Sequence, residues 1–207
     1  MWKWKFSGLL LLLFLACEKF EYSPHQDHTP SFKNTNINND NIHLLKEKEK
    51  KSNNDTIKIA VIGDTQGYYN ETKDFVKTIN AYHDLDLVVH NGDITDFGLL
   101  KEHQVIQNIF ADLKFPIVTV IGNHDMLGNG ENVYKNLYGD LNFSFDYKGT
   151  RFIFFNSNAM EYNFRPGVPD INWISSQLVA TLNFKRAILV SHVGFYDRDF
   201  GKINTEK

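Results

Sequence analysis

The feature that most constrains the fold is an alternation of short apolar runs with amphipathic segments. Apolar runs occupy residues 57–62, 85–90 and 116–121, and the segments 71–83 and 99–113 between them carry apolar residues at helical spacing. A strand–helix–strand–helix–strand order predicts right-handed crossovers and a parallel sheet. The second of these runs is rich in branched apolar residues, as expected for a strand that is covered on both faces. The sequence therefore predicts an α/β fold.

The second half of the chain has a different texture. The runs 143–147 and 151–156 flank a short turn with a central glycine, which predicts a β-hairpin. Residues 170–182 show helical spacing, and the apolar run 186–190 predicts another buried strand. We expect one folded domain over residues 56–207.

A polar turn follows each of the first three strands. The turns are Gly63-Asp64-Thr65-Gln66, Gly92-Asp93-Ile94-Thr95-Asp96 and Gly122-Asn123-His124-Asp125. Such turns are individually common and mostly structural, but the carboxyl ends of parallel strands meet at one edge of the sheet. We therefore expect a cluster there, which His192 joins from a fourth strand: Asp64, Gln66, Asp93, Asn123, His124 and His192. Carboxylate, amide and imidazole donors together suit Mn, Fe or Zn better than calcium.

Four ordered motifs resemble those of the calcineurin-like metallophosphoesterases. They are Gly-Asp-Thr-Gln (63–66), Gly-Asp-Ile-Thr-Asp (92–96), Gly-Asn-His-Asp (122–125) and Val-Ser-His (190–192). The resemblance covers residues 57–195 and implies two packed mixed β-sheets flanked by helices, a four-layer αββα fold. It also implies hydrolysis of phosphate mono- or diesters by a hydroxide held between two divalent metal ions.

The resemblance assigns metal ligands by position. Asp64 and Gln66 would hold the first ion, and Asp93 would bridge the two ions. Asn123 and His192 would hold the second. Many family members carry histidine where this chain has Gln66, and an amide oxygen is the weaker donor.

The resemblance also gives catalytic roles to His124 and Asp96. His124 would stabilise or protonate the leaving oxygen, and the Asp96 carboxylate would orient its imidazole. Structural alternatives remain, since Asp96 can cap the following helix, Gln66 can be a surface turn residue and His192 can simply be hydrogen-bonded. His90 adjoins the bridging turn, and we expect it to be a core or supporting histidine and not a ligand.

One family motif is missing, the Gly-His-x-His turn that gives a histidine to each metal. No such turn appears before Lys207. We expect a domain that is incomplete at its C-terminus and lacks its last strands. The alternative function is a non-catalytic envelope lipoprotein, or an inactive fragment with an incomplete metal site.

Residues 1–17 resemble a bacterial lipoprotein signal peptide. Two lysines precede an apolar stretch that is short for a membrane span, and the stretch ends at Cys17. Lipidation of Cys17 would anchor the chain to the membrane of the bacterial cell envelope, outside the cytoplasm. An ordinary signal peptide or membrane anchor with an incidental cysteine is the alternative. Residues 18–55 lack periodicity and predict a flexible tether.

Charge and motif content give no support to nucleic-acid or nucleotide binding. The formal net charge of -3 gives no reason to expect nucleic-acid binding. The chain also lacks the spaced glycines of a dinucleotide-binding fingerprint and a nucleotide-binding P-loop. The expected partners are a phosphate-ester substrate and a membrane, while the substrate's identity and the oligomeric state stay open.

Overall fold

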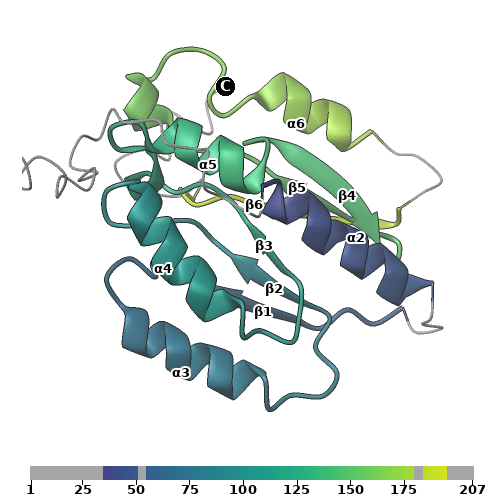
Figure 1. The fold of residues 1–207 in the computed structure, drawn as a ribbon. Coiled ribbons are helices and arrows are strands. Elements are labelled where there is room, and N and C mark those ends of the chain that lie inside the picture. Colours follow the sequence, from purple (N-terminus) through teal and green to yellow (C-terminus); the bar gives the residue numbers. More distant parts are fainter. Residues whose placement is uncertain (1–34, 51–54, 180–183, 195–207) are drawn as a thin grey trace, which may run out of the picture.

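The computed structural model describes residues 35–50, 55–179 and 184–194, which form two small β-sheets with helices packed on them (Figure 1). The predicted signal peptide and Cys17 lie outside the described residues. Within the described part, no helix is long and apolar enough to span a membrane.

The first sheet is parallel, as predicted from the alternation of strands and helices. Its strands β1 (Ile59–Ile62), β2 (Leu87–His90) and β3 (Ile117–Thr119) lie in the order β1-β2-β3. The helices α3 (Tyr69–Ile79) and α4 (Leu100–Phe110) form the two crossovers. All three strands therefore end at the same edge of the sheet.

The second sheet is mixed. Strands β4 (Phe143–Tyr147) and β5 (Thr150–Phe154) form the predicted antiparallel hairpin, and β6 (Arg186–Val190) pairs in parallel with β5. The helix α6 (Ile171–Gln177) lies between β5 and β6 in the chain. The carboxyl end of β6 thus leads directly to His192.

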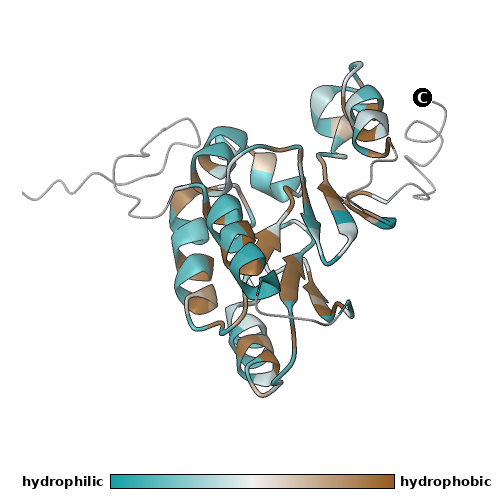
Figure 2. Ribbon diagram, turned by 90° about the vertical axis from the view of Figure 1, so that its right-hand side faces the viewer, coloured by the Kyte–Doolittle hydropathy of each residue, from teal (hydrophilic) through white to brown (hydrophobic). Residues whose placement is uncertain are grey.

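The elements pack in four layers, α/β/β/α, which is the expected fold. The core between the sheets is built from the inward residues of both sheets: Leu87, Val89, Val118, Phe145, Phe152 and Phe154. The opposite face of the first sheet packs on α3 and α4, with Val88 and Ile106 fully buried. The outer face of the second sheet packs on α6 through Ile153, Phe155 and Ile174. Most apolar residues of the helices face the strands (Figure 2).

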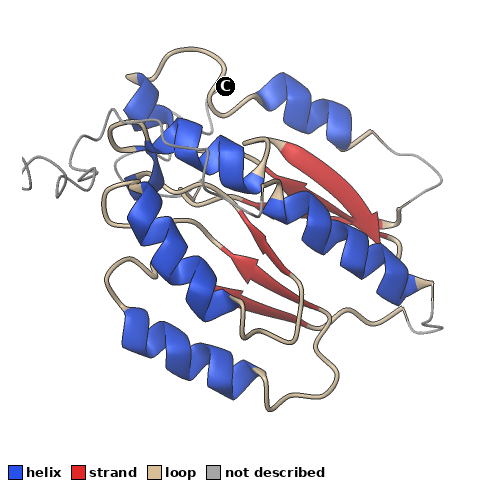
Figure 3. Ribbon diagram, viewed as in Figure 1, coloured by secondary structure: helices blue, strands red, loops and turns tan. Residues whose placement is uncertain are grey.

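Two α-helices were not predicted: α2 (Ile37–Glu49) and α5 (Gly130–Tyr138). Short 3-10 turns at His124–Met126 and Ala159–Tyr162 complete the described elements (Figure 3). Helix α2 falls inside the predicted tether over 18–55, so the expectation of a flexible chain is wrong for that part.

The physical reason is that hydrogen bonds with the edge strand of the first sheet help to hold α2 in place. The Asn38 side chain accepts a hydrogen bond from the Thr119 N–H (2.9 Å) and donates one to the Thr119 carbonyl (3.1 Å). The amide thus pairs with β3 as a neighbouring strand would, and it covers part of an otherwise open edge. Such a contact leaves no periodic signal in the sequence.

At the amino end of the strands, the carboxylate of Asp86 joins several layers. It is 4% exposed and accepts hydrogen bonds from the Tyr147 hydroxyl (2.8 Å), Lys148 Nζ (3.1 Å) and the Lys58 N–H (2.9 Å). Lys48 of α2 adds an ion pair at 3.3 Å. Burial alone would raise the pKa of Asp86, but these donors and charges outweigh burial and lower it.

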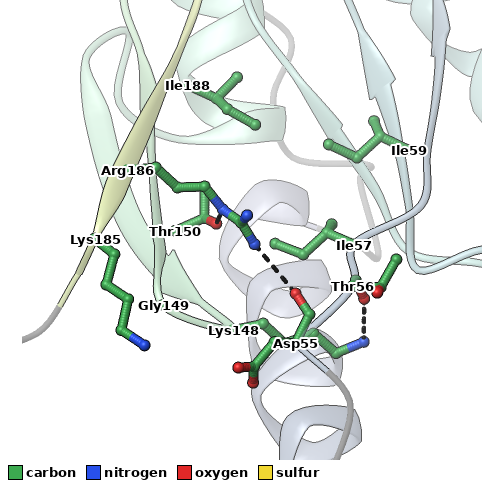
Figure 4. A pocket seen from close by; sticks show the side chains of 10 residues that line it. All are labelled: Asp55, Thr56, Ile57, Ile59, Lys148, Gly149, Thr150, Lys185, Arg186 and Ile188. Carbon is green, nitrogen blue, oxygen red and sulfur yellow. Dashed lines mark hydrogen bonds between the residues drawn. The ribbon is translucent and has the colours of Figure 1, made fainter.

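A groove of about 710 Å³ opens at the same end, between the start of β1 and the start of β6 (Figure 4). Arg186 lies across it and donates hydrogen bonds to Thr150 Oγ1 (2.6 Å) and to the Asp55 carbonyl (3.1 Å). The groove lies at the opposite end of the strands from the polar turns, so it is not the site that the sequence motifs predict.

Candidate metal centre

The first two polar turns are held together by their backbones. The N–H of Asp64 donates to the Gly92 carbonyl (3.1 Å), and the N–H of Thr65 donates to the Asp93 carbonyl (3.0 Å). Asp64 and Asp93 both adopt left-handed backbone conformations, with φ of 52° and 53°. That conformation is uncommon for residues other than glycine, and such outliers cluster at functional sites.

Two glycines allow the turns to approach closely. A Cβ on Gly122 would lie 2.1 Å from both the backbone nitrogen and Oδ1 of Asp93. A Cβ on Gly92 would lie 2.9 Å from the backbone of Gly122 and from Cβ of His192. The second turn, the third turn and the end of β6 therefore meet where only glycine fits.

Side chains from four strand ends converge at this point. Ligand atoms of Asp64, Asp93 and His192 all lie within 4.8 Å of one another. His192 Nε2 is 3.4 Å from Asp93 Oδ2 and 3.1 Å from Asn123 Oδ1. The structure thus brings together four of the five residues that the sequence assigned to metal binding.

The ring of His192 is oriented by a hydrogen bond that its Nδ1 makes. Because a carbonyl can only accept, Nδ1–H of His192 donates to the Asn91 carbonyl (2.8 Å), which leaves Nε2 facing the carboxylates. This arrangement is usual for histidines that bind a metal. Burial disfavours the charged ring, but Asp93 and the Asn91 carbonyl outweigh it and raise the pKa of His192 to about 8.

The fifth residue, Gln66, is at the edge of the cluster. Its Nε2 lies 3.5 Å from Asp93 Oδ2, a marginal hydrogen bond, and its buried Oε1 has no hydrogen-bond partner among the described residues. A buried amide oxygen without a partner is costly. Carboxylates, an imidazole and amide oxygens therefore form a donor set that fits a divalent metal.

His124 lies beside the cluster and contacts it through its backbone. The N–H of His124 donates to Asp93 Oδ1 (2.9 Å), and its ring Nδ1–H donates to the backbone carbonyl of Asp96 (2.8 Å). Asp96 is therefore the residue that orients His124, but through its carbonyl and not, as expected, through its carboxylate. Asp96 is also not the cap of α4, whose first turn is closed by Glu102.

Asp125 is a site residue for which the sequence analysis assigned no role. It is fully buried, and its carboxylate accepts hydrogen bonds from the N–H groups of Ile94, Thr95 and Gly122 at 2.9–3.2 Å and from Thr95 Oγ1 at 2.9 Å. Burial raises the pKa of Asp125 to about 6, and these donors oppose that shift. Asp125 thus fixes the bridging turn against the third turn.

His90 supports the same turns from the core, as expected for a core or supporting histidine. It is fully buried, and its Nδ1 accepts a hydrogen bond from the Gly92 N–H (3.2 Å). Nε2–H therefore donates to Thr65 Oγ1 (2.9 Å). Burial lowers the pKa of His90 to about 3, so the ring is neutral.

Comparison with known proteins identifies the family of this chain. The family model of the calcineurin-like phosphoesterases matches residues 57–205. The chain belongs to this family. A search among curated proteins found no match.

Solved structures give partial likenesses. A purple acid phosphatase from yellow lupin (Lupinus luteus) seeds shares 19% identity with a TM-score of 0.47, over 65% of this chain and 30% of that one. A predicted phosphoesterase from Streptococcus pneumoniae shares 18% identity with a TM-score of 0.34, over 57% and 55%. A protein of unknown function from Aquifex aeolicus shares 17% with a TM-score of 0.37, over 58% and 75%. The chain thus spans less than a third of the lupin enzyme.

Proposed function

We propose that this chain is a metal-dependent phosphoesterase that hydrolyses phosphate mono- or diesters with two divalent ions of Mn, Fe or Zn. The observation that carries the proposal is the convergence of Asp64, Asp93 and His192 within 4.8 Å at the edge where all the parallel strands end. Membership of the calcineurin-like phosphoesterases supports the reaction class.

The ligands would divide between the ions as the motifs imply. Asp64 and Gln66 would hold one ion, Asn123 and His192 the other, and Asp93 both. Bound ions would supply a nucleophile from water near neutral pH and offset charge on the phosphoryl oxygens. The Asn91 carbonyl keeps the proton of neutral His192 on Nδ1, so Nε2 is free to bind.

The remaining residues act on the leaving group and on the turns. Because Nδ1 of His124 donates to the Asp96 carbonyl, Nε2 is the atom that can deliver a proton to the leaving oxygen. The backbone N–H of His124 occupies Oδ1 of Asp93, which fixes the direction of the bridging carboxylate. Asp125 holds the second and third polar turns together, because its carboxylate accepts hydrogen bonds from the N–H groups of Ile94 and Gly122.

The test is hydrolysis of 4-nitrophenyl phosphate with added Mn²⁺. We expect Asp93→Asn to lower kcat by about a thousandfold, because an amide cannot join two cations as a carboxylate does. Asp86→Asn is the matched control, a buried carboxylate at the other end of β2, and it should retain activity. Turnover by Asp93→Asn at the wild-type rate would contradict the assignment. Metal binding without turnover by the wild type would support the non-catalytic alternative.

A further inference from the structure

Three large apolar side chains remain exposed on the loops of the metal centre. Tyr68 is 59% exposed, Phe97 61% and Leu127 41%. Each lies within four residues of a proposed site residue, after the first, second and third polar turn respectively. Exposed apolar side chains that gather around a polar site are typical of a binding surface.

The loops that carry these side chains are in contact. A Cβ on Gly67, next to Tyr68, would lie 3.3 Å from Oδ2 of Asp96, which directly precedes Phe97. A Cβ on Gly98, which follows Phe97, would lie 2.9 Å from the Leu127 carbonyl. The three side chains therefore start from one continuous set of loops beside the proposed leaving-group histidine.

The position of Phe97 is fixed by its neighbours. Its N–H donates to Glu102 Oε2 (3.0 Å), and the next N–H, that of Gly98, donates to Thr95 Oγ1 (3.1 Å). An exposed ring on a backbone held in this way is prepared for contact at little entropic cost.

The charges of the same loops limit what the substrate can be. Segments 63–69, 92–99 and 122–130 contain no Lys or Arg. Further phosphate or carboxylate groups beside the reacting phosphoryl group would find no cationic side chain of these types on the three loops. An apolar organic group would meet Tyr68, Phe97 and Leu127.

We propose that Tyr68, Phe97 and Leu127 form an apolar rim that binds the organic part of the substrate, a phosphate ester of an aliphatic or aromatic alcohol. This rests on the proposed function. Nucleoside polyphosphates are disfavoured as substrates, because these loops carry no Lys or Arg for the additional phosphates.

The test compares hexyl phosphate with ethyl phosphate, whose reacting groups are alike. With Mn²⁺, we expect kcat/KM to be about tenfold higher for the hexyl ester, since partly burying four more methylenes favours it, and ATP to be the poorest substrate. Phe97→Ala should reduce the hexyl advantage to about twofold. Tyr82→Ala is the matched control, because Tyr82 is 57% exposed beyond the far end of α3 and should leave the ratio unchanged.

A second readout separates this inference from the proposed function. Hexylphosphonate and ethylphosphonate cannot be hydrolysed, and calorimetry with the Mn²⁺-loaded chain compares their binding. Suppose that the wild type binds hexylphosphonate more tightly than ethylphosphonate, that Phe97→Ala removes this preference, and that neither ester is hydrolysed. This result would overturn the proposed function but support the apolar rim. Equal affinity for the two phosphonates would overturn the rim. The rim would also be overturned by a second result. In that result, Phe97→Ala no longer binds phosphatidylglycerol vesicles but keeps the wild-type ratio of kcat/KM between the hexyl and ethyl esters, because Phe97 would then contact a lipid surface and not the substrate.

Discussion

The two ends of the first sheet hold buried carboxylates in opposite surroundings. At the amino end, Asp86 is met by the ammonium groups of Lys48 and Lys148. At the carboxyl end, Asp125 accepts hydrogen bonds only from neutral N–H and O–H groups in the described contacts, and Asp93 lies close to a second carboxylate, Asp64.

The difference distinguishes an end that is held by ion pairs from the end that carries the proposed metal site. Opposite charges at the amino end satisfy each other and join α2 to both sheets. Two carboxylates held together at the carboxyl end repel each other unless a cation lies between them. Without a metal, protonated His192 is the cation beside these carboxylates, since its pKa is raised to about 8. A divalent ion would replace that proton and offset both carboxylates.

The largest expected effect on stability and Mn²⁺ affinity comes from filling the contact between the turns. Gly122→Ala would place a Cβ 2.1 Å from Asp93, so the bridging turn must move. We expect a loss of about 3 kcal/mol in the free energy of unfolding and a fall in Mn²⁺ affinity of about a hundredfold, measured by chemical denaturation and calorimetry. Gly194→Ala, with open space around its Cβ, is the control. Unchanged affinity in Gly122→Ala would show that the close approach does not matter.

A smaller effect is expected from replacing Asp125, the buried carboxylate that joins the second and third polar turns. Asp125→Asn turns one acceptor into a donor that faces backbone N–H groups, which should cost about 2–3 kcal/mol of stability and lower Mn²⁺ affinity about tenfold. Asp86→Asn should cost similar stability but leave the affinity unchanged. If both variants lower Mn²⁺ affinity equally, the division between the two ends is wrong.

The smallest effect is a pH dependence at the structural end. The pKa of Asp86 is lowered from 3.8, so its contribution to stability is complete above pH 3.8 and is lost as the pH falls through the lower value. The stability difference between wild type and Asp86→Asn should therefore be constant near neutral pH and shrink below pH 4. Urea denaturation at several pH values measures it. A difference that grows on acidification would contradict the ion-pair network.

Much of the fold follows from local patterns in the sequence. The apolar runs before His90 and before Gly122 indicate parallel strands because their helical connections are equally clear. Helix α5 is not among the predicted elements, although Val133, Tyr134, Leu137 and Tyr138 show helical spacing. Helix α2 could not be predicted in this way. Asn38 and Asn41 hold it against β3 by hydrogen bonds with the β3 backbone, and such contacts leave no periodic pattern in the sequence.

The convergence of the candidate ligands could be predicted, since parallel topology brings strand ends together. The contacts within the site could not. Nothing in the sequence distinguishes a carbonyl contact of Asp96 from a carboxylate contact. Asp125 looks like an ordinary turn residue until its partners in the neighbouring turn are known.

We propose above all that Asp93 would bridge two metal ions at the carboxyl end of the first sheet. Crystals soaked in Mn²⁺ and measured for anomalous scattering test it directly. The account predicts two peaks about 3.5–4 Å apart, both in contact with Asp93, one beside Asp64 and the other beside His192. Ordered Asp93 and His192 side chains with no anomalous peak in contact with Asp93 would contradict it.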